Sequence, residues 1–283
     1  MTERQKSIPK IIHYCWFGGK PIPDHLQTCL DTWSKLEGYQ IKRWDESNCS
    51  FDENDFVRKA YADRKLGFIG DYYRLKAVYE YGGIYLDTDV VINRSFDELL
   101  THDCFLNFIY DCSVGTAIIG SRKNNPFIKG LIDMYDKILI SHNDSGKTLE
   151  WKEDGMLHTN GFAPTSNYCF TYYILNHYPQ FLLNNRFQDL GDFVIYPKEM
   201  FEIGRLDGKH YALHLCDGVW RKNKQEAPSI KDNIKHFLAR FPWFFDKVRI
   251  ITRSIRYKKK NSSIPFYAYS CAQKNNTELP ELF

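Results

Sequence analysis

The chain has 283 residues and a net charge of +3, with 43% hydrophobic and 26% charged residues. These proportions are typical of a globular protein and exclude a disordered or collagen-like chain. No apolar run approaches the roughly 18 residues that a membrane-spanning helix needs, and the polar residues 1–10 do not resemble a signal peptide.

Eight cysteines are scattered along the chain without a Cys-x-x-Cys pair. Because structural zinc sites and thioredoxin-like motifs use such pairs, we expect neither of them. A chain of this length without a secretion signal is typical of a reducing compartment, so we expect free thiols and a cytoplasmic location.

Strand-like and helix-like patterns alternate along most of the chain. Short apolar and aromatic runs predict strands at residues 9–17, 39–44, 84–86, 104–110, 116–119, 193–196 and 211–215. Apolar residues at helical spacing predict helices at residues 24–33, 56–65, 69–81, 126–140 and 165–177. The polar residues 141–161 predict a mobile loop. This alternation predicts an α/β sandwich around a mostly parallel central sheet.

Positive charge is concentrated near the C-terminus. Residues 221–260 contain 13 Lys or Arg and three acidic residues, a net of +10, so the rest of the chain sums to −7. The same segment carries apolar side chains at Phe237, Leu238, Phe241, Trp243, Phe244, Phe245, Val248, Ile250, Ile251 and Ile255. This mixture is typical of a helix lying on an anionic membrane surface.

Two other interpretations of this basic segment stay open. It can be a solvated helical appendage that packs on the body of the protein, or it can bind nucleic acid. No recognised nucleic-acid motif accompanies the charge, which disfavours nucleic acid as a partner. The membrane interpretation adds the inner face of the membrane as a peripheral location.

Two carboxylates follow one of the predicted strands. Asp87 and Asp89 flank Thr88 directly after the apolar run 84–86. Alternate residues of a continuing strand point the same way, so both carboxylates can face one site. Adjacent carboxylates repel unless a cation compensates, and Mn²⁺ or Mg²⁺ is the natural choice for carboxylate oxygens. The alternative is a turn with two solvated acids.

Further residues upstream strengthen the ligand interpretation. The carboxyl end of a strand is where open α/β sheets bind ligands. Asp71 and Arg74 are three residues apart on a predicted helix and hence share one face, where a guanidinium suits a phosphate and an acid suits sugar hydroxyls. The alternative for this pair is an ion pair on the helix surface. Gly82 and Gly83 allow a tight backbone turn before the strand.

Two ordered motifs resemble a known family. The first is IPKIIHYCWFGG at residues 8–19, and the second is GDYYR at 70–74 followed by YGGIYLDTD at 81–89. They resemble the DXD-containing sugar-binding glycosyltransferases, which include capsular polysaccharide glycosyltransferases, fungal α-mannosyltransferases and, more distantly, glucosylating clostridial toxins. The resemblance covers roughly residues 8–220. It implies a GT-A type, Rossmann-like fold, a nucleotide-sugar donor, a divalent metal ion and retention of anomeric configuration.

The resemblance also implies roles for individual residues. The donor-binding set is Trp16, Phe17, Asp71, Arg74, Gly82, Gly83, Tyr85, Asp87 and Trp220. Within it, Trp16 would stack on the nucleotide base, and Asp71 and Arg74 would hold the donor sugar. Asp87 would contact ribose or metal, and Asp89 would ligate the metal directly. Asp87, Asp89 and Arg74 form the expected catalytic set.

The late segment 211–220 supplies the expected third metal ligand. His214 is the preferred ligand and Asp217 the alternative. Trp220 would close over the diphosphate. Val219 replaces the serine that usually precedes this tryptophan in the family, and valine has no side-chain group that could hydrogen-bond to a phosphate. Residues 159–164 loosely resemble the family's Gly-Pro loop on the acceptor side.

Together these features predict a metal-dependent, retaining hexosyltransferase. We expect a catalytic domain over residues 1–222 and a basic, helical extension over residues 223–283. From the resemblance alone, the expected donor is a UDP-hexose, with GDP-mannose open, and the expected acceptor is a polysaccharide or a lipid-linked saccharide. The alternatives are a toxin-like transferase that glycosylates protein and a non-catalytic module that binds nucleotide sugars.

Overall fold

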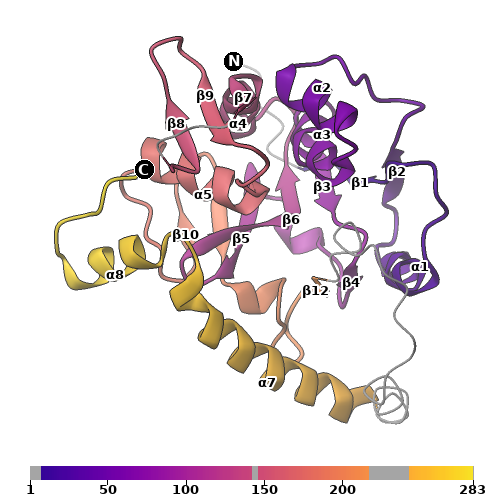
Figure 1. The fold of residues 1–283 in the computed structure, drawn as a ribbon. Helices are drawn as coiled ribbons and strands as arrows, with labels where there is room; N and C mark the ends of the chain where they lie inside the picture. Colours follow the sequence, from indigo (N-terminus) through magenta and orange to yellow (C-terminus); the bar gives the residue numbers. More distant parts are fainter. Residues whose placement is uncertain (1–7, 142–145, 217–241, 283) are drawn as a thin grey trace, which may run out of the picture.

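A computed structural model describes residues 8–141, 146–216 and 242–282, with the side chains of 242–246 excepted (Figure 1). Several expectations fall outside these residues: Asp217, Val219 and Trp220, the domain boundary at 222, and the basic segment before residue 242. The other predicted site residues are all described.

A seven-stranded sheet forms the centre of the molecule, in the order β10-β11-β5-β6-β3-β1-β2. Its strands are β1 (Ile11–Cys15), β2 (Gln40–Trp44), β3 (Gly83–Leu86), β5 (Cys104–Tyr110), β6 (Ser113–Ser121), β10 (Gln188–Asp189) and β11 (Val194–Tyr196). The strands β1, β2, β3, β5 and β11 run in one direction, and β6 and β10 run against them. The predicted α/β class with a mostly parallel sheet is therefore confirmed.

The helices lie mainly on one face of the central sheet. They are α1 (Asp24–Asp31), α2 (Asp55–Ala62), α3 (Leu66–Tyr81), α4 (Pro126–Asp136), α5 (Ser166–His177), α7 (Pro242–Lys260) and α8 (Tyr267–Asn275). The larger core joins α2, α3, α4 and α5 to one face of the sheet, and the smaller core lies on the other face. Residues of β3 alternate between them, because Tyr85 enters the first core and Ile84 and Leu86 enter the second.

Side-chain caps fix the starts of three of these helices. Asn54 accepts a hydrogen bond from the Val57 N–H at the start of α2, and Asn125 does the same for α4, where proline is the first helical residue. Thr165 caps α5. The long helix α3 has nine buried residues. It therefore carries its polar groups into the interior of the protein.

Two predicted elements differ in kind from the observed ones. The helix expected at 126–140 ends at Asp136, and β7 (Ile138–Ser141) follows it. The loop expected at 141–161 contains β8 (Leu149–Trp151) and β9 (Leu157–Asn160), which form a small sheet with β7. A short apolar run such as 138–140 has the same pattern in a helix and in a strand, and pairing with β9 decides between them.

A buried histidine ties β1 to its neighbours. His13 is fully buried, and its Nε2 lies 2.8 Å from the Gly82 carbonyl oxygen. Its Nδ1 accepts a hydrogen bond from the indole N–H of Trp44 at 3.2 Å. A neutral imidazole satisfies both contacts. Burial lowers the pKa of His13 to about 4, so the ring is neutral at pH 7.

All eight cysteines are free thiols, as expected. Within the part of the chain that the structure describes, no helix is both long enough and apolar enough to cross a membrane.

Candidate active site

The first part of the site is a turn at the carboxyl end of β3. The expectation that the strand continues through Asp87 and Asp89 is wrong. The Asp87 N–H makes the last bond to β6, at the Ala117 carbonyl (2.8 Å), and the Val90 N–H then turns back to the Asp87 carbonyl at 3.1 Å. Asp and Thr favour such turns because their side chains compete with regular backbone pairing. The strand that follows, β4 (Val90–Ile92), belongs to another sheet.

A second strand brings a histidine to this turn. In β12 (Ala212–His214), His214 pairs in register with Val90 of β4, the residue after Asp89. The His214 Nε2 lies 3.3 Å from the Asp89 Oδ1. One ligand atom each from Asp87, Asp89 and His214 lie within 4.8 Å of one another. The turn and the strand pairing therefore gather the three side chains that the sequence predicted as metal ligands.

A buried carboxylate stands behind the histidine. Glu202 is fully buried, and its Oε2 lies 2.7 Å from the His214 Nδ1. Its Oε1 accepts a hydrogen bond from Asn107 at 3.0 Å. Because an ionised carboxylate only accepts, the Nδ1 must donate, and the Nε2 is left to face the two aspartates. The sequence analysis did not find Glu202, and no local motif marks it.

Charge around His214 stabilises its protonated form in the metal-free protein. Burial opposes that charge, but Cys216, Glu202 and Asp89 raise the pKa of His214 well above its usual value. Both ring nitrogens then donate, one to Glu202 and the other to Asp89. A metal ion at the Nε2 would have to displace one proton.

The other side of Asp87 is held by residues of α3 and β3. The guanidinium of Arg74 lies 2.8 Å from the Asp71 Oδ1 and 3.6 Å from the Asp87 Oδ1. It also donates to the Thr116 carbonyl at 2.7 Å and lies over the ring of Tyr85. The Tyr85 hydroxyl donates to the Asp87 Oδ1 at 2.8 Å. Asp87 is thus fixed by a cation and a phenol.

Asp71 and Arg74 form a buried pair rather than a surface pair, with 7% and 6% of their surface exposed. Burial raises the pKa of Asp71 to about 6, although Arg74 opposes that shift. Burial works against the charge of Arg74 as well, yet Asp87, Tyr85 and Asp71 raise its pKa. A charged group this deeply buried is typical of a functional site.

The acceptor-side loop of the prediction lies next to this pair. The Phe162 ring is 4.8 Å from that of Phe68, in the first turn of α3. Ser166, the first residue of α5, hydrogen-bonds to Asp71 and lies 2.9 Å from the Thr116 hydroxyl. The segment 159–166 therefore borders Asp71, although it is distant in sequence.

The predicted base-stacking segment lies at the end of β1. Trp16 is half-buried, and its indole N–H donates to the Lys20 carbonyl at 2.6 Å. Phe17 packs between Phe51 and Tyr73, each with its ring 6.0 Å away. Phe17 thus contributes to the larger core, and Trp16, like Phe17, is only partly buried.

The two predicted glycines lie at the other end of β3 from Asp87. At about 3.3 Å per residue, Gly83 is roughly 13 Å and Gly82 roughly 17 Å away. A Cβ on Gly83 would come within 2.5 Å of the Ile11 carbonyl oxygen, and one on Gly82 within 2.8 Å of Pro9. Both residues have positive φ, of 112° and 67°. These contacts explain both glycines by close packing of β3 against β1.

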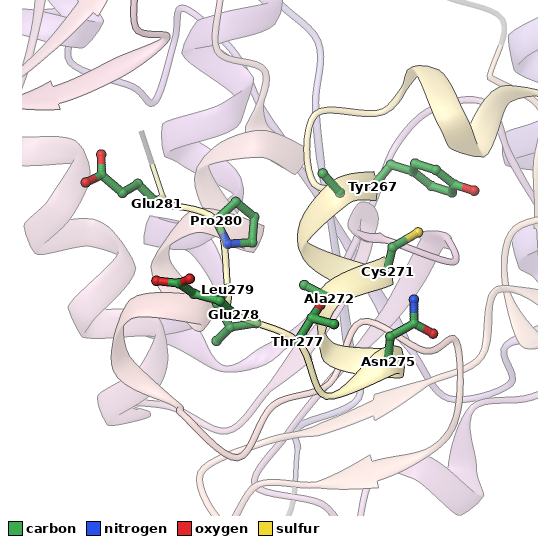
Figure 2. A pocket seen from close by; sticks show the side chains of 10 residues that line it. Tyr267, Cys271, Ala272, Asn275, Thr277, Glu278, Leu279, Pro280 and Glu281 are labelled. Carbon is green, nitrogen blue, oxygen red and sulfur yellow. The ribbon is translucent and has the colours of Figure 1, made fainter.

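One hollow lies elsewhere on the molecule. It is formed by α8 and the tail that follows it, and Tyr267, Cys271 and Glu281 contribute to its walls (Figure 2). None of the predicted site residues lines it. We therefore place the chemistry at the carboxyl end of β3.

The sequence comparisons agree with the geometry. Residues 23–106 match the family model described as "Glycosyltransferase sugar-binding region containing DXD motif". This segment is a DXD-containing glycosyltransferase sugar-binding region. The predicted resemblance is thereby confirmed, and Asp87 and Asp89 are the aspartates of its DXD motif. Trp16 and His214 lie outside the matched residues.

Two curated proteins are similar to the chain. Inositol phosphoceramide mannosyltransferase 3 of Schizosaccharomyces pombe is 30% identical over 135 residues, which cover 45% of this chain and 37% of that protein. The uncharacterized glycosyltransferase L373 of Acanthamoeba polyphaga mimivirus is 30% identical over 154 residues, 49% of this chain and 58% of that protein. The chain thus spans only part of these relatives.

Two solved structures are also similar to it. The PaToxG glycosyltransferase has a TM-score of 0.44 at 18% identity, covering 62% of this chain and 70% of that chain. A glycosyltransferase involved in the glycosylation of the major capsid of PBCV-1 has a TM-score of 0.36 at 11% identity, covering 74% of this chain and 94% of that chain.

The donor atoms of this region suit a divalent ion. Two carboxylates and one imidazole can ligate Mn²⁺, and the carboxylates can ligate Mg²⁺. Glu202, His214 and Cys216 also have ligand atoms within 4.8 Å of one another. In that second group, however, the Nδ1 of His214 is already hydrogen-bonded to Glu202. The ring nitrogen that remains for a metal ion is the Nε2, which faces Asp89 in the first group.

Proposed function

We propose that the chain is a metal-dependent glycosyltransferase that moves a hexose from a nucleotide sugar to a polysaccharide or lipid-linked saccharide. The observation that carries the proposal is the meeting of Asp87, Asp89 and His214 at the carboxyl end of β3. The two aspartates lie in a segment that matches the sugar-binding region of glycosyltransferases. The third residue comes from a strand more than 100 residues later.

Each residue of the site has a defined task in this proposal. Asp89 and His214 hold a Mn²⁺ or Mg²⁺ ion, with Asp87 as a third ligand or a ribose contact. When bound, the ion supplies positive charge that stabilises the departing diphosphate. Arg74 is already bonded to Asp71 and Thr116 and lies close to Asp87, so its task is to orient Asp87. Asp71 borders the segment 159–166 and would bind sugar hydroxyls there.

The proposal includes retention of configuration, which the family resemblance implies. Attack from the face of the leaving group lets the departing phosphate accept the proton of the acceptor hydroxyl. The sequence analysis identified no dedicated protein base for this step. The configuration of the product at the anomeric carbon, measured by proton NMR, tests this part of the proposal, and an inverted product would refute it.

Donor and acceptor are proposed from the sequence and from one relative. The family resemblance favours a UDP-hexose, whereas the similarity to a mannosyltransferase of Schizosaccharomyces pombe supports a mannose donor such as GDP-mannose equally. The name of that relative also includes inositol phosphoceramide, which is a lipid, so we favour a lipid-linked acceptor over protein. Transfer to a lipid-linked saccharide extract but not to protein would support this choice, and transfer to protein alone would support the toxin-like alternative.

Thermal shift with nucleotide sugars tests the core of the proposal. A donor at about 100 times its dissociation constant stabilises the folded state by about 2.7 kcal/mol, which is roughly 5 °C in Tm for a chain of this size. We expect this shift with Mn²⁺ present and its loss in Asp89→Asn. The matched control Asp31→Asn removes an exposed carboxylate of α1 and should keep it. Unchanged sugar transfer by Asp89→Asn would refute the assignment.

A further inference from the structure

The helix α7 has two different long faces. One face packs on the body of the protein directly beneath β12 (Figure 1). The opposite face is exposed. Residues 247–260 of this helix contain seven Lys or Arg and no acidic residue. The two faces can therefore serve different purposes.

The inner face of α7 is anchored next to the metal site. Ile250 is buried and packs against Gly204, so closely that a Cβ added to this glycine would lie 3.2 Å from the Ile250 side chain. Arg253 donates to the backbone carbonyl of His214. Tyr257 stacks on Tyr110 with ring centroids 5.0 Å apart, and its hydroxyl lies 3.2 Å from the Cys216 sulfur. These contacts fix which side of the helix points outward.

The outer face combines aliphatic and cationic side chains. Ile251 and Ile255 are one turn apart and are 47% and 51% exposed. Exposed cations surround them at Lys247, Arg256, Lys258, Lys259 and Lys260. Among the residues that the structure describes, no ion pair with a carboxylate is made by Arg256, Lys258 or Lys259. An apolar strip bordered by cations is the pattern of a helix that lies in a membrane interface.

We propose that the outer face of α7 docks on an anionic lipid surface. The isoleucines would enter the boundary between headgroups and acyl chains, and the lysines would reach the phosphates beside them. Nucleic acid fits less well, because single-stranded binding uses aromatic side chains, and in residues 247–260, where the side chains of α7 are described, the exposed apolar ones are aliphatic. The five exposed cations of this face exclude a cationic partner and complement an anionic one.

This orientation has a consequence for the proposed transfer reaction, and only this step rests on the proposed function. Arg253 contacts the strand that carries His214, while Ile251 and Ile255 lie across the helix. A helix with its side chains is about 10 Å in diameter. Docking would thus hold the metal site within roughly one helix diameter of the lipid headgroups, where a lipid-linked acceptor is presented.

Vesicle co-sedimentation of the full chain tests the proposal. We expect binding to vesicles of phosphatidylcholine mixed with phosphatidylglycerol and not to phosphatidylcholine alone, with binding weakened by added salt. Each lysine near an anionic surface contributes about fivefold, so Lys258→Gln/Lys259→Gln should weaken binding by roughly 25-fold. Ile251→Ser/Ile255→Ser should weaken it roughly tenfold or more.

A matched control has the same loss of charge elsewhere. Lys123→Gln/Lys152→Gln removes two exposed lysines, one beside Gly82 at the far end of β3 and one next to β8, and should bind anionic vesicles like the parent chain. Equal binding to neutral and anionic vesicles, an equal loss in the control, or a preference for RNA over vesicles would each overturn the proposal. If vesicle binding fails while Mn²⁺-dependent donor binding persists, the docking inference alone falls.

Discussion

The contact between Glu202 and His214 makes the sharpest test of the site. We consider Glu202→Gln, which keeps the shape of the side chain and removes its charge. In the parent chain the carboxylate can only accept, so the His214 Nδ1 donates across 2.7 Å and the Nε2 is kept for a metal ion. The new amide can itself donate to the Nδ1. The proton would then move to the Nε2, the nitrogen that faces Asp89.

The size of the effect follows from the contacts of Glu202. Loss of an oriented partner behind a ligating histidine typically costs 10- to 100-fold in metal affinity, which is about 1.4–2.7 kcal/mol. The bond from Asn107 survives, because the Gln oxygen can accept it. The charge-assisted bond to His214 is lost and costs the metal-free fold about 1.5–3 kcal/mol.

Calorimetric titration with Mn²⁺ measures the first quantity, and urea unfolding measures the second. Glu98→Gln is the matched control, because Glu98 is an exposed glutamate that bonds to Tyr211 and lies outside the metal cluster. We expect the control to bind Mn²⁺ like the parent chain. Parent-like Mn²⁺ affinity in Glu202→Gln would refute the idea that this carboxylate selects the ligating nitrogen.

Three further predictions concern the fold. Burial lowers the pKa of His13 from 6.5 to about 4. The neutral ring therefore stabilises the fold fully above pH 6.5, and about 3 kcal/mol of unfolding free energy is lost as the pH falls from 6.5 toward 4. Urea unfolding across this range should show the loss in the parent chain and not in His13→Gln. Gly83→Ala should lower the free energy of unfolding in urea by about 1–3 kcal/mol through backbone strain, and further through the clash of the new Cβ with the Ile11 carbonyl oxygen. Gly191→Ala has a positive φ but open space around the Cβ, so it should lose only the strain energy. Phe266→Ala should cost about 3–5 kcal/mol in a single unfolding transition, because Phe266 belongs to the larger core; a separate minor transition would show that the C-terminal segment folds independently.

Elements that rest on local patterns could be predicted from the sequence. The helix α3 and the strand β5 lie within a few residues of their expected bounds, because each is long or strongly apolar. The strands β7, β8 and β9 have three or four residues each. Strands this short exist only through pairing with distant segments, and a single sequence carries no record of that pairing.

The residues of the candidate site also fall into those that a local motif reveals and those that depend on contacts with distant segments. Asp87 and Asp89 could be found because the motif is local, and His214 because the resemblance pointed to the late segment. The expected continuing strand was wrong because the bonds that end β3 come from β6 and those that place β4 come from β12. Glu202 is 12 residues from His214 in the sequence, and Asn107, which donates to Glu202, is 95 residues from it. Its role depends on burial, which the local sequence does not encode.

The strand β12 is held from two sides, and this explains how distant parts of the chain can act on the one proposed metal site. Glu202 fixes the imidazole ring of His214, and Arg253 of α7 bonds to the carbonyl of the same residue. The strand itself pairs with β4 immediately after Asp89. Only the aspartates lie within the matched region 23–106. The sugar-binding region therefore supplies two of the three proposed ligands, and the remainder of the chain supplies the third, its orientation and the helix that we place on the lipid surface.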